Sequence, residues 1–115
     1  MTIEWALQQL TPGAAWSIID DQLVWHDKNI PQPTQAEIDS KVSEYDTIIQ
    51  KESVRAERDR RIEAIMWRVE RYESEVRQGI TPMDDIAALD AYIQALRDVP
   101  LQEGFPEEVF WPIEP

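Results

Sequence analysis

The sequence of 115 residues predicts a mainly α-helical protein in which a long helix and a C-terminal helix form an antiparallel helical hairpin. Three observations support this prediction. No proline or glycine occurs between Gln35 and Gln78, apolar residues recur at helical spacing on both sides of Gly79, and a tail rich in proline and aromatic residues follows Pro100. We expect a small subdomain with a helix and a β-hairpin over residues 1–33, before a helical domain over residues 34–115.

The first predicted element is a short helix that ends before Pro12 and Gly13, with Thr2 as its N-cap. Its apolar residues gather on one side, and these are Ile3, Trp5, Ala6, Leu7 and Leu10. Because a helix of this length is not stable alone in water, it must dock on the next element.

Residues 15–26 read AWSIIDDQLVWH, two short apolar runs on either side of Asp20, Asp21 and Gln22, which predicts a β-hairpin. Trp16 and Trp25 then pair across the strands, a contact that contributes up to about 1 kcal/mol. Since a two-stranded hairpin is marginal in water, it either folds over the chain's own helices or receives a strand from a partner chain.

Thr34 and Glu37 form a capping box and start the long helix. A narrow coiled-coil-like seam follows, weakens over residues 52–61 and then returns; its residues are Ile38, Val42, Tyr45, Ile49, Ile62, Ile65 or Met66, Val69, Tyr72 and Val76. The absence of helix breakers favours one continuous helix over residues 35–78, rather than a break near residues 52–57. A continuous helix is long enough to be partly covered by other chains, so a homo-oligomer is one expectation.

Thr81 and Pro82 are predicted to start the last helix, with Asp84 and Asp85 in its first turn. Its apolar stripe should pack on residues 62–76 and consists of Ile86, Leu89, Tyr92, Ile93 and Leu96. The helix should end at Asp98 or Val99, because Pro100 cannot continue it.

The tail beyond Pro100 is not expected to be helical, yet it carries Phe105, Phe110 and Trp111. So much apolar surface must lie against the chain's own helices, against another chain, or both. Aromatic side chains are frequent among binding hot spots, so these three are candidate partner-binding residues. For Trp111, closure of the chain's own core is an equal alternative.

The net charge is −12, which argues against a nucleic-acid partner, and the surface acidity serves either solubility or attraction of a basic partner. The cations concentrate in an arginine-rich segment, where Arg55, Arg58, Arg60 and Arg61 alternate with Glu57 and Asp59. We expect ion pairs such as Glu57 with Arg61 on a solvated face, or alternatively contacts with acidic groups of a partner. Arg97 either complements the end of its helix or contacts a partner, and Arg97 or Asp98 is also a candidate to tie the tail back to the arginine-rich helix.

No catalytic or cofactor site is predicted. The chain has no cysteine, and its single histidine, His26, has no converging partners. No glycine-rich phosphate loop or nucleophile elbow occurs, and no apolar run reaches the length of a membrane span. We therefore expect an unexported, soluble protein that is not an enzyme and holds no metal or cofactor.

Several motifs in the second half of the chain occur together in one known family. These are LRDVP, GFP and a terminal WP, preceded by RDRRIEAIMW and by VERYESEVRQGITPMDD. In this combination the sequence resembles the phage tail assembly chaperones, also called tail fibre assembly proteins. The resemblance is good from Val54 to Pro115 and looser in the N-terminal third. Met66 precedes Trp67 where many relatives have aspartate or glutamine.

The resemblance implies a protein that binds a phage tail fibre protein in the host cytoplasm and assists its folding, trimerisation or attachment. It either leaves the fibre or remains on the virion tail. The candidate fibre contacts are Trp16, Trp25, Arg97, Phe105, Phe110 and Trp111. The alternatives are a structural virion subunit of the tail or fibre tip, whose long helix forms an oligomeric stem, and an acidic protein that binds a basic host protein.

Overall fold

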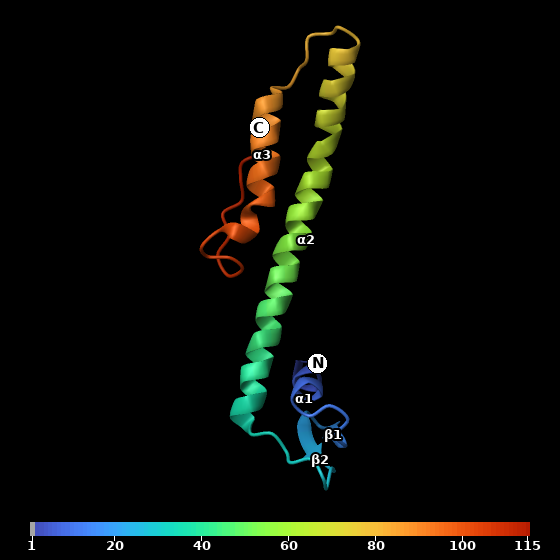
Figure 1. Ribbon diagram of the computed structural model, residues 1–115, viewed down its shortest axis with the longest axis vertical. Helices are drawn as coiled ribbons and strands as arrows, with labels where there is room; N and C mark the ends of the chain where they lie inside the picture. The colour runs from blue at the N-terminus through green and yellow to red at the C-terminus, as the bar shows by residue number, and fades with distance from the viewer. Residues whose placement is uncertain (1) are drawn as a thin grey trace. The chain divides into compact units, whose positions relative to one another are not determined.

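The computed structural model describes residues 2–115 and confirms the mainly helical fold. The elements along the chain are helix α1 (Thr2–Leu10), strands β1 (Trp16–Ile19) and β2 (Gln22–Trp25), helices α2 (Gln35–Arg77) and α3 (Ile86–Arg97), and the short 3-10 helix η1 (Val99–Leu101) (Figure 1). They form two compact units, one up to Ile49 and one from Gln50 to Pro115, and α2 contributes to both.

The β-hairpin of the first unit turns through two residues, Asp20 and Asp21, whose φ angles of 50° and 61° are left-handed. Such turns match the twist of paired antiparallel strands, and aspartate tolerates this conformation better than most residues. The register places Trp16 opposite Trp25, as predicted. Gln22 belongs to β2 rather than to the turn.

The core of the first unit is built by α1, the hairpin and the start of α2. Ala6, Leu7 and Ile38 are buried at its centre. Around them pack Ile3, Trp5, Leu10, Trp16, Leu23, Trp25 and Val42. The hairpin therefore covers the chain's own helices, the first of the two arrangements that the sequence allowed. Within residues 2–115 the sheet has two strands, so no third strand pairs with either edge.

Helix α2 is continuous, as predicted, and both of its ends follow from local sequence. At the start, the Thr34 N–H donates to Glu37 Oε1 at 3.1 Å and the Glu37 N–H donates to Thr34 Oγ1 at 3.2 Å, a reciprocal capping box. At the end, Gly79 has a φ of 71° and Ile80 donates its N–H to the carbonyl of Glu75. This is the Schellman arrangement that a left-handed glycine permits.

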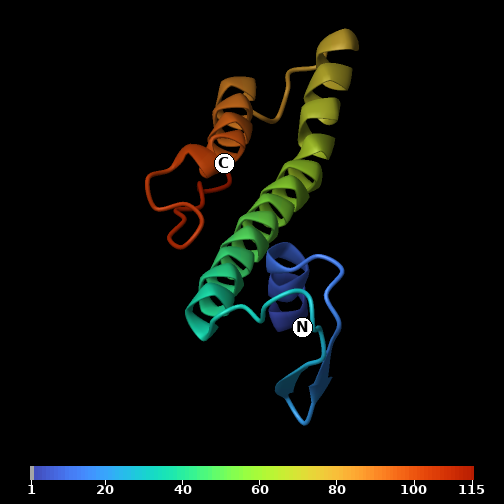
Figure 2. The same ribbon diagram turned by 60° about the horizontal axis from the view of Figure 1, so that its bottom comes forward.

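The core of the second unit lies between α3 and the C-terminal part of α2, which run side by side in both views (Figures 1 and 2). Its buried residues are Ile65, Leu89, Tyr92, Ile93 and Leu96. Ile62, Met66, Val69, Ile86 and Trp111 pack against them. The predicted helical hairpin is confirmed.

The predicted start of α3 at Thr81 and Pro82 is wrong, because the helix begins at Ile86. Asp85 is the N-cap, and its side chain accepts a hydrogen bond from the Ala87 N–H at 3.0 Å. Asp84, expected in the first helical turn, instead reaches across to α2 and holds the preceding segment as a loop. The end of α3 at Asp98 agrees with the prediction, although η1 adds one 3-10 turn beyond it.

Candidate functional site

The C-terminal tail folds back on itself after η1. The Gln102 side chain donates to the Phe110 carbonyl and accepts from the Phe110 N–H, each at 2.8 Å. Inside this loop, the Glu108 N–H donates to the carbonyl of Gly104 at 2.8 Å. A Cβ at Gly104 would lie 2.7 Å from the Glu108 carbonyl oxygen, so the loop closes this tightly only with glycine at that position.

Two aromatic side chains of the tail lie under arginines of α2. The Arg61 Cζ is 4.3 Å from the centre of the Trp111 ring, and the Arg55 Cζ is 5.3 Å from that of Phe105. Both distances are within the range of cation–π contacts. The arginine-rich segment therefore contacts the chain's own tail, and it does so through Phe105 and Trp111. Trp111 also packs against the core of the second unit.

The outer side of the tail remains uncovered in this structure. Leu101 is 81% exposed, Phe110 is 72% exposed and Ile113 is 91% exposed. We call these three residues the tail surface. The tail is anchored to α2 through Phe105 and Trp111. Large apolar side chains that are exposed on such an anchored segment are typical of sites that contact another protein.

Asp84 and Arg68 fasten the loop before α3 and the end of the tail to the same place on α2. Asp84 binds Arg68 Nη2 at 2.6 Å and Arg71 Nη2 at 2.7 Å. Hydrogen bonds from Arg68 and Arg71 lower the pKa of Asp84 to about 2. The Arg68 Nη1 also donates to the Pro115 carbonyl at 2.7 Å. No local sequence pattern signals this cluster, because the pairing depends on how the loop before α3 meets α2.

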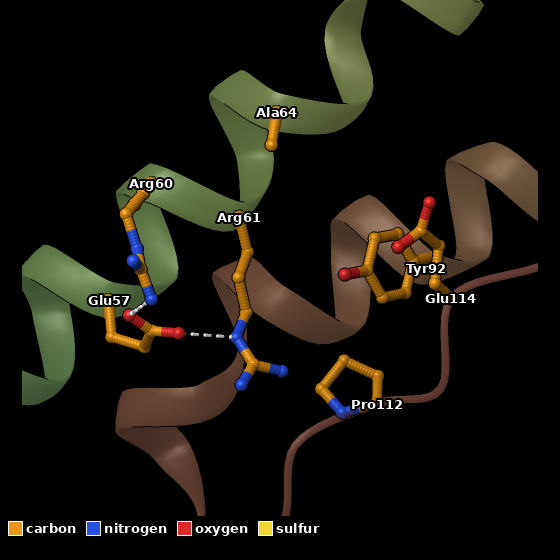
Figure 3. A pocket seen from close by; sticks show the side chains of 7 residues that line it. All are labelled: Glu57, Arg60, Arg61, Ala64, Tyr92, Pro112 and Glu114. Carbon is orange, nitrogen blue, oxygen red and sulfur yellow. Dashed lines mark hydrogen bonds and ion pairs between the residues drawn. The ribbon is translucent and has the colours of Figure 1, made fainter.

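A cleft with a volume of about 390 Å³ opens between the arginine-rich segment, α3 and the tail (Figure 3). It is lined by Glu57, Arg60, Arg61, Ala64, Tyr92, Pro112 and Glu114. The predicted pair of Glu57 and Arg61 is present at 2.8 Å, and Arg60 binds the same carboxylate. Hydrogen bonds from Arg61 and Arg60 lower the pKa of Glu57.

The other predicted contact residues lie apart from this cleft. Arg97 is exposed in the last turn of α3, and the neighbouring Asp98 accepts from Gln94 Nε2 at 3.0 Å. Within residues 2–115, neither forms an ion pair with the arginine-rich segment. Trp16 and Trp25 are partly buried in the first unit, and the Trp25 indole N–H donates to the Ile30 carbonyl at 3.0 Å.

His26 is exposed, and its Nε2 lies 2.7 Å from Ser17 Oγ. In the part of the chain that the structure describes, no three acidic, histidine or cysteine side chains come together as metal ligands would. Over the same residues, no helix is long and apolar enough to cross a membrane.

A family model described as phage tail assembly chaperone protein matches residues 51–115. These residues include most of α2, all of α3 and the complete tail, and thus nearly the whole second unit. Neither a curated protein nor a solved structure matches the chain.

Proposed function

Because this chain belongs to the phage tail assembly chaperone family, we propose that it binds a tail fibre protein and assists its folding, trimerisation or attachment. The family match supports a role in tail assembly with a phage tail protein as partner. The fibre as that partner, and the steps that are assisted, are the finer parts of the proposal. Such a role operates in the host cytoplasm while phage particles are assembled.

The observation that carries the proposal is the tail surface. Leu101, Phe110 and Ile113 expose apolar side chains, whereas Phe105 and Trp111 lie under arginines of α2. A segment that is already ordered loses little conformational entropy when it binds. A fibre chain that has not yet trimerised exposes the apolar surface that its neighbours will later cover. The tail surface supplies a complementary apolar face until trimerisation takes place.

In this proposal the predicted contact residues have different tasks. Phe110 contacts the fibre protein directly, and Trp111 and Phe105 hold Phe110 in position. Arg97 contributes a polar contact at the exposed end of α3. Trp16 and Trp25 belong to a second contact through the hairpin, whose strand edges are unpaired within residues 2–115.

Co-expression with a tail fibre protein of the same phage, followed by size-exclusion chromatography with light scattering, tests the proposal. We expect a stable complex that Phe110→Ala weakens more than about tenfold, as expected for a binding hot spot. Met83→Ala is the matched control, because Met83 is an apolar residue of the same unit, 76% exposed and outside the tail. Absence of a complex, or equal weakening by both variants, would contradict the proposal.

Mass spectrometry of purified virions separates a transient chaperone from a protein that stays on the particle. A released chaperone is absent from virions that contain the fibre at full occupancy. A retained protein is present in a fixed ratio to the fibre.

A further inference from the structure

We propose that the cleft beside Arg61 binds the carboxylate of an acidic side chain in an extended segment of the partner protein, with Arg61 as the anchor. The inference rests on the proposed function in taking the fibre protein as the source of that segment. It concerns a surface separate from the outward-facing tail surface, and it assigns the cleft a ligand of defined chemistry.

Arg61 is held in one orientation by contacts that leave part of its guanidinium group free. Its Nε donates to Glu57 at 2.8 Å, and its Cζ lies 4.3 Å from the centre of the Trp111 ring. Neither Nη1 nor Nη2 has a hydrogen-bond partner among the residues that the structure describes. In Figure 3 the group lies between Glu57 and the ring of Pro112, and Arg61 is one of the residues that line the cleft. A fixed guanidinium with two free terminal nitrogens suits a carboxylate, which accepts two parallel hydrogen bonds.

The walls of the cleft suit a peptide. Ala64 and Pro112 supply apolar surface on opposite sides, and the Tyr92 hydroxyl offers a further hydrogen-bonding group (Figure 3). Arg60 also lines the cleft, and its side chain is 74% exposed. The volume of about 390 Å³ lies within the range of about 300 to 1,000 Å³ that is usual for ligand sites.

Charge favours a carboxylate over a phosphate. Although the chain has a net charge of −12, its residues 55–61 contain four arginines and two acidic residues. Both acids are already paired, Glu57 with Arg60 and Arg61, and Asp59 with Arg58. On the opposite side, Glu114 lies 3.5 Å from Arg68. This glutamate repels a doubly charged phosphate or a nucleic-acid backbone more than it repels one carboxylate.

Titration of the full chain with two blocked peptides tests the site without the fibre protein. The probes are acetyl-Ala-Glu-Leu-amide and its counterpart with glutamine in place of glutamate. Nuclear magnetic resonance follows the Arg61 Nε–H and the Trp111 indole N–H. We expect saturable chemical-shift changes with the glutamate peptide. The affinity for the glutamine peptide should be at least about tenfold weaker. Equal shifts, no shifts, or tighter binding of inorganic phosphate would overturn the inference.

The complex with the fibre protein supplies the second test. Arg61→Lys keeps the charge but removes the two-nitrogen fork, and we expect about tenfold weaker binding. Near-ultraviolet circular dichroism shows whether Arg61→Lys disturbs Trp111. If it does, Arg60→Gln, which changes an exposed side chain, is the variant that tests the role of the cleft in fibre binding. Arg77→Gln, at an exposed position at the end of α2, is the control for charge.

The two failures are distinguishable. If the wild-type chain binds the fibre protein and both cleft variants bind it equally well, the inference falls and the proposed function stands. If the wild-type chain binds no fibre protein, the proposed function falls, and the peptide titration decides the chemistry of the cleft independently.

Discussion

Asp84 Oδ1 lies 2.6 Å from Arg68 Nη2, which joins the loop before α3 to α2. The same arginine donates to the carbonyl of Pro115 at the end of the tail. Arg71 holds the second carboxylate oxygen of Asp84 at 2.7 Å. One small polar cluster therefore positions two segments that are distant in sequence, α3 through its preceding loop and the tail through its end.

The first prediction concerns pH. The pKa of Asp84 falls from 3.8 to about 2 in the folded chain, because Arg68 and Arg71 stabilise its charged form. A lowered folded-state pKa adds stability that is fully present above the unfolded value and is lost as the pH falls through about 2. Asp84→Asn should lower the thermal midpoint at neutral pH and remove this part of the acid dependence. Thermal melts followed by tryptophan fluorescence across this pH range measure both effects.

Asp90→Asn is the control for this experiment, because Asp90 is an exposed carboxylate on α3. It should leave the thermal midpoint nearly unchanged. Identical pH profiles for wild type and Asp84→Asn would show that the cluster does not contribute to stability.

The second prediction concerns the core of the second unit. Leu89 is fully buried between α3 and α2. Leu89→Ala should reduce the free energy of unfolding by about 2 to 5 kcal/mol, from lost burial and from the cavity that remains. Urea denaturation followed by far-ultraviolet circular dichroism measures the change. Ala87→Ser on the exposed side of the same helix should change it by less than about 0.5 kcal/mol, and a similar loss in both variants would refute the assigned packing.

The helices and the hairpin were predictable because their signals are local. The capping box at Thr34 and Glu37 marks the start of α2, and the absence of proline and glycine up to Gln78 accounts for its continuity. The pairing of Trp16 with Trp25 follows from two apolar runs around a pair of aspartates. Each of these features depends on residues close together in the chain.

The start of α3 and the cleft were not predictable in this way. Proline at position 82 is a good helix-start signal, but Asp84 binds two arginines of α2, and Asp85 caps the helix that begins at Ile86. The sequence leaves Trp111 divided between the core and a partner, because its contact with Arg61 depends on the return path of the tail. The cleft combines three segments, so no single stretch of sequence signals it.

The third prediction concerns the tail loop. Gly104→Ala would bring a Cβ to 2.7 Å from the Glu108 carbonyl oxygen and 2.9 Å from the Glu108 Cβ. Relief of this overlap must shift the backbone, at a cost of about 1 to 3 kcal/mol, and it displaces Phe110 from Gln102. We expect faster amide hydrogen exchange at Phe110 and weaker fibre binding. Glu103→Ala, at an exposed neighbouring position, should change neither, and slow exchange in Gly104→Ala would contradict the assigned role of the glycine.

The most direct test of the account is the yield of fibre trimers. Denatured fibre protein is diluted into buffer with this chain, with its Phe110→Ala variant, or with neither, and trimers are counted by size-exclusion chromatography with light scattering. The account predicts that the wild-type chain raises the trimer yield and that Phe110→Ala loses most of that gain, because Phe110 is the exposed aromatic residue of the tail surface. An equal yield of trimers without the chain would contradict the proposed chaperone function.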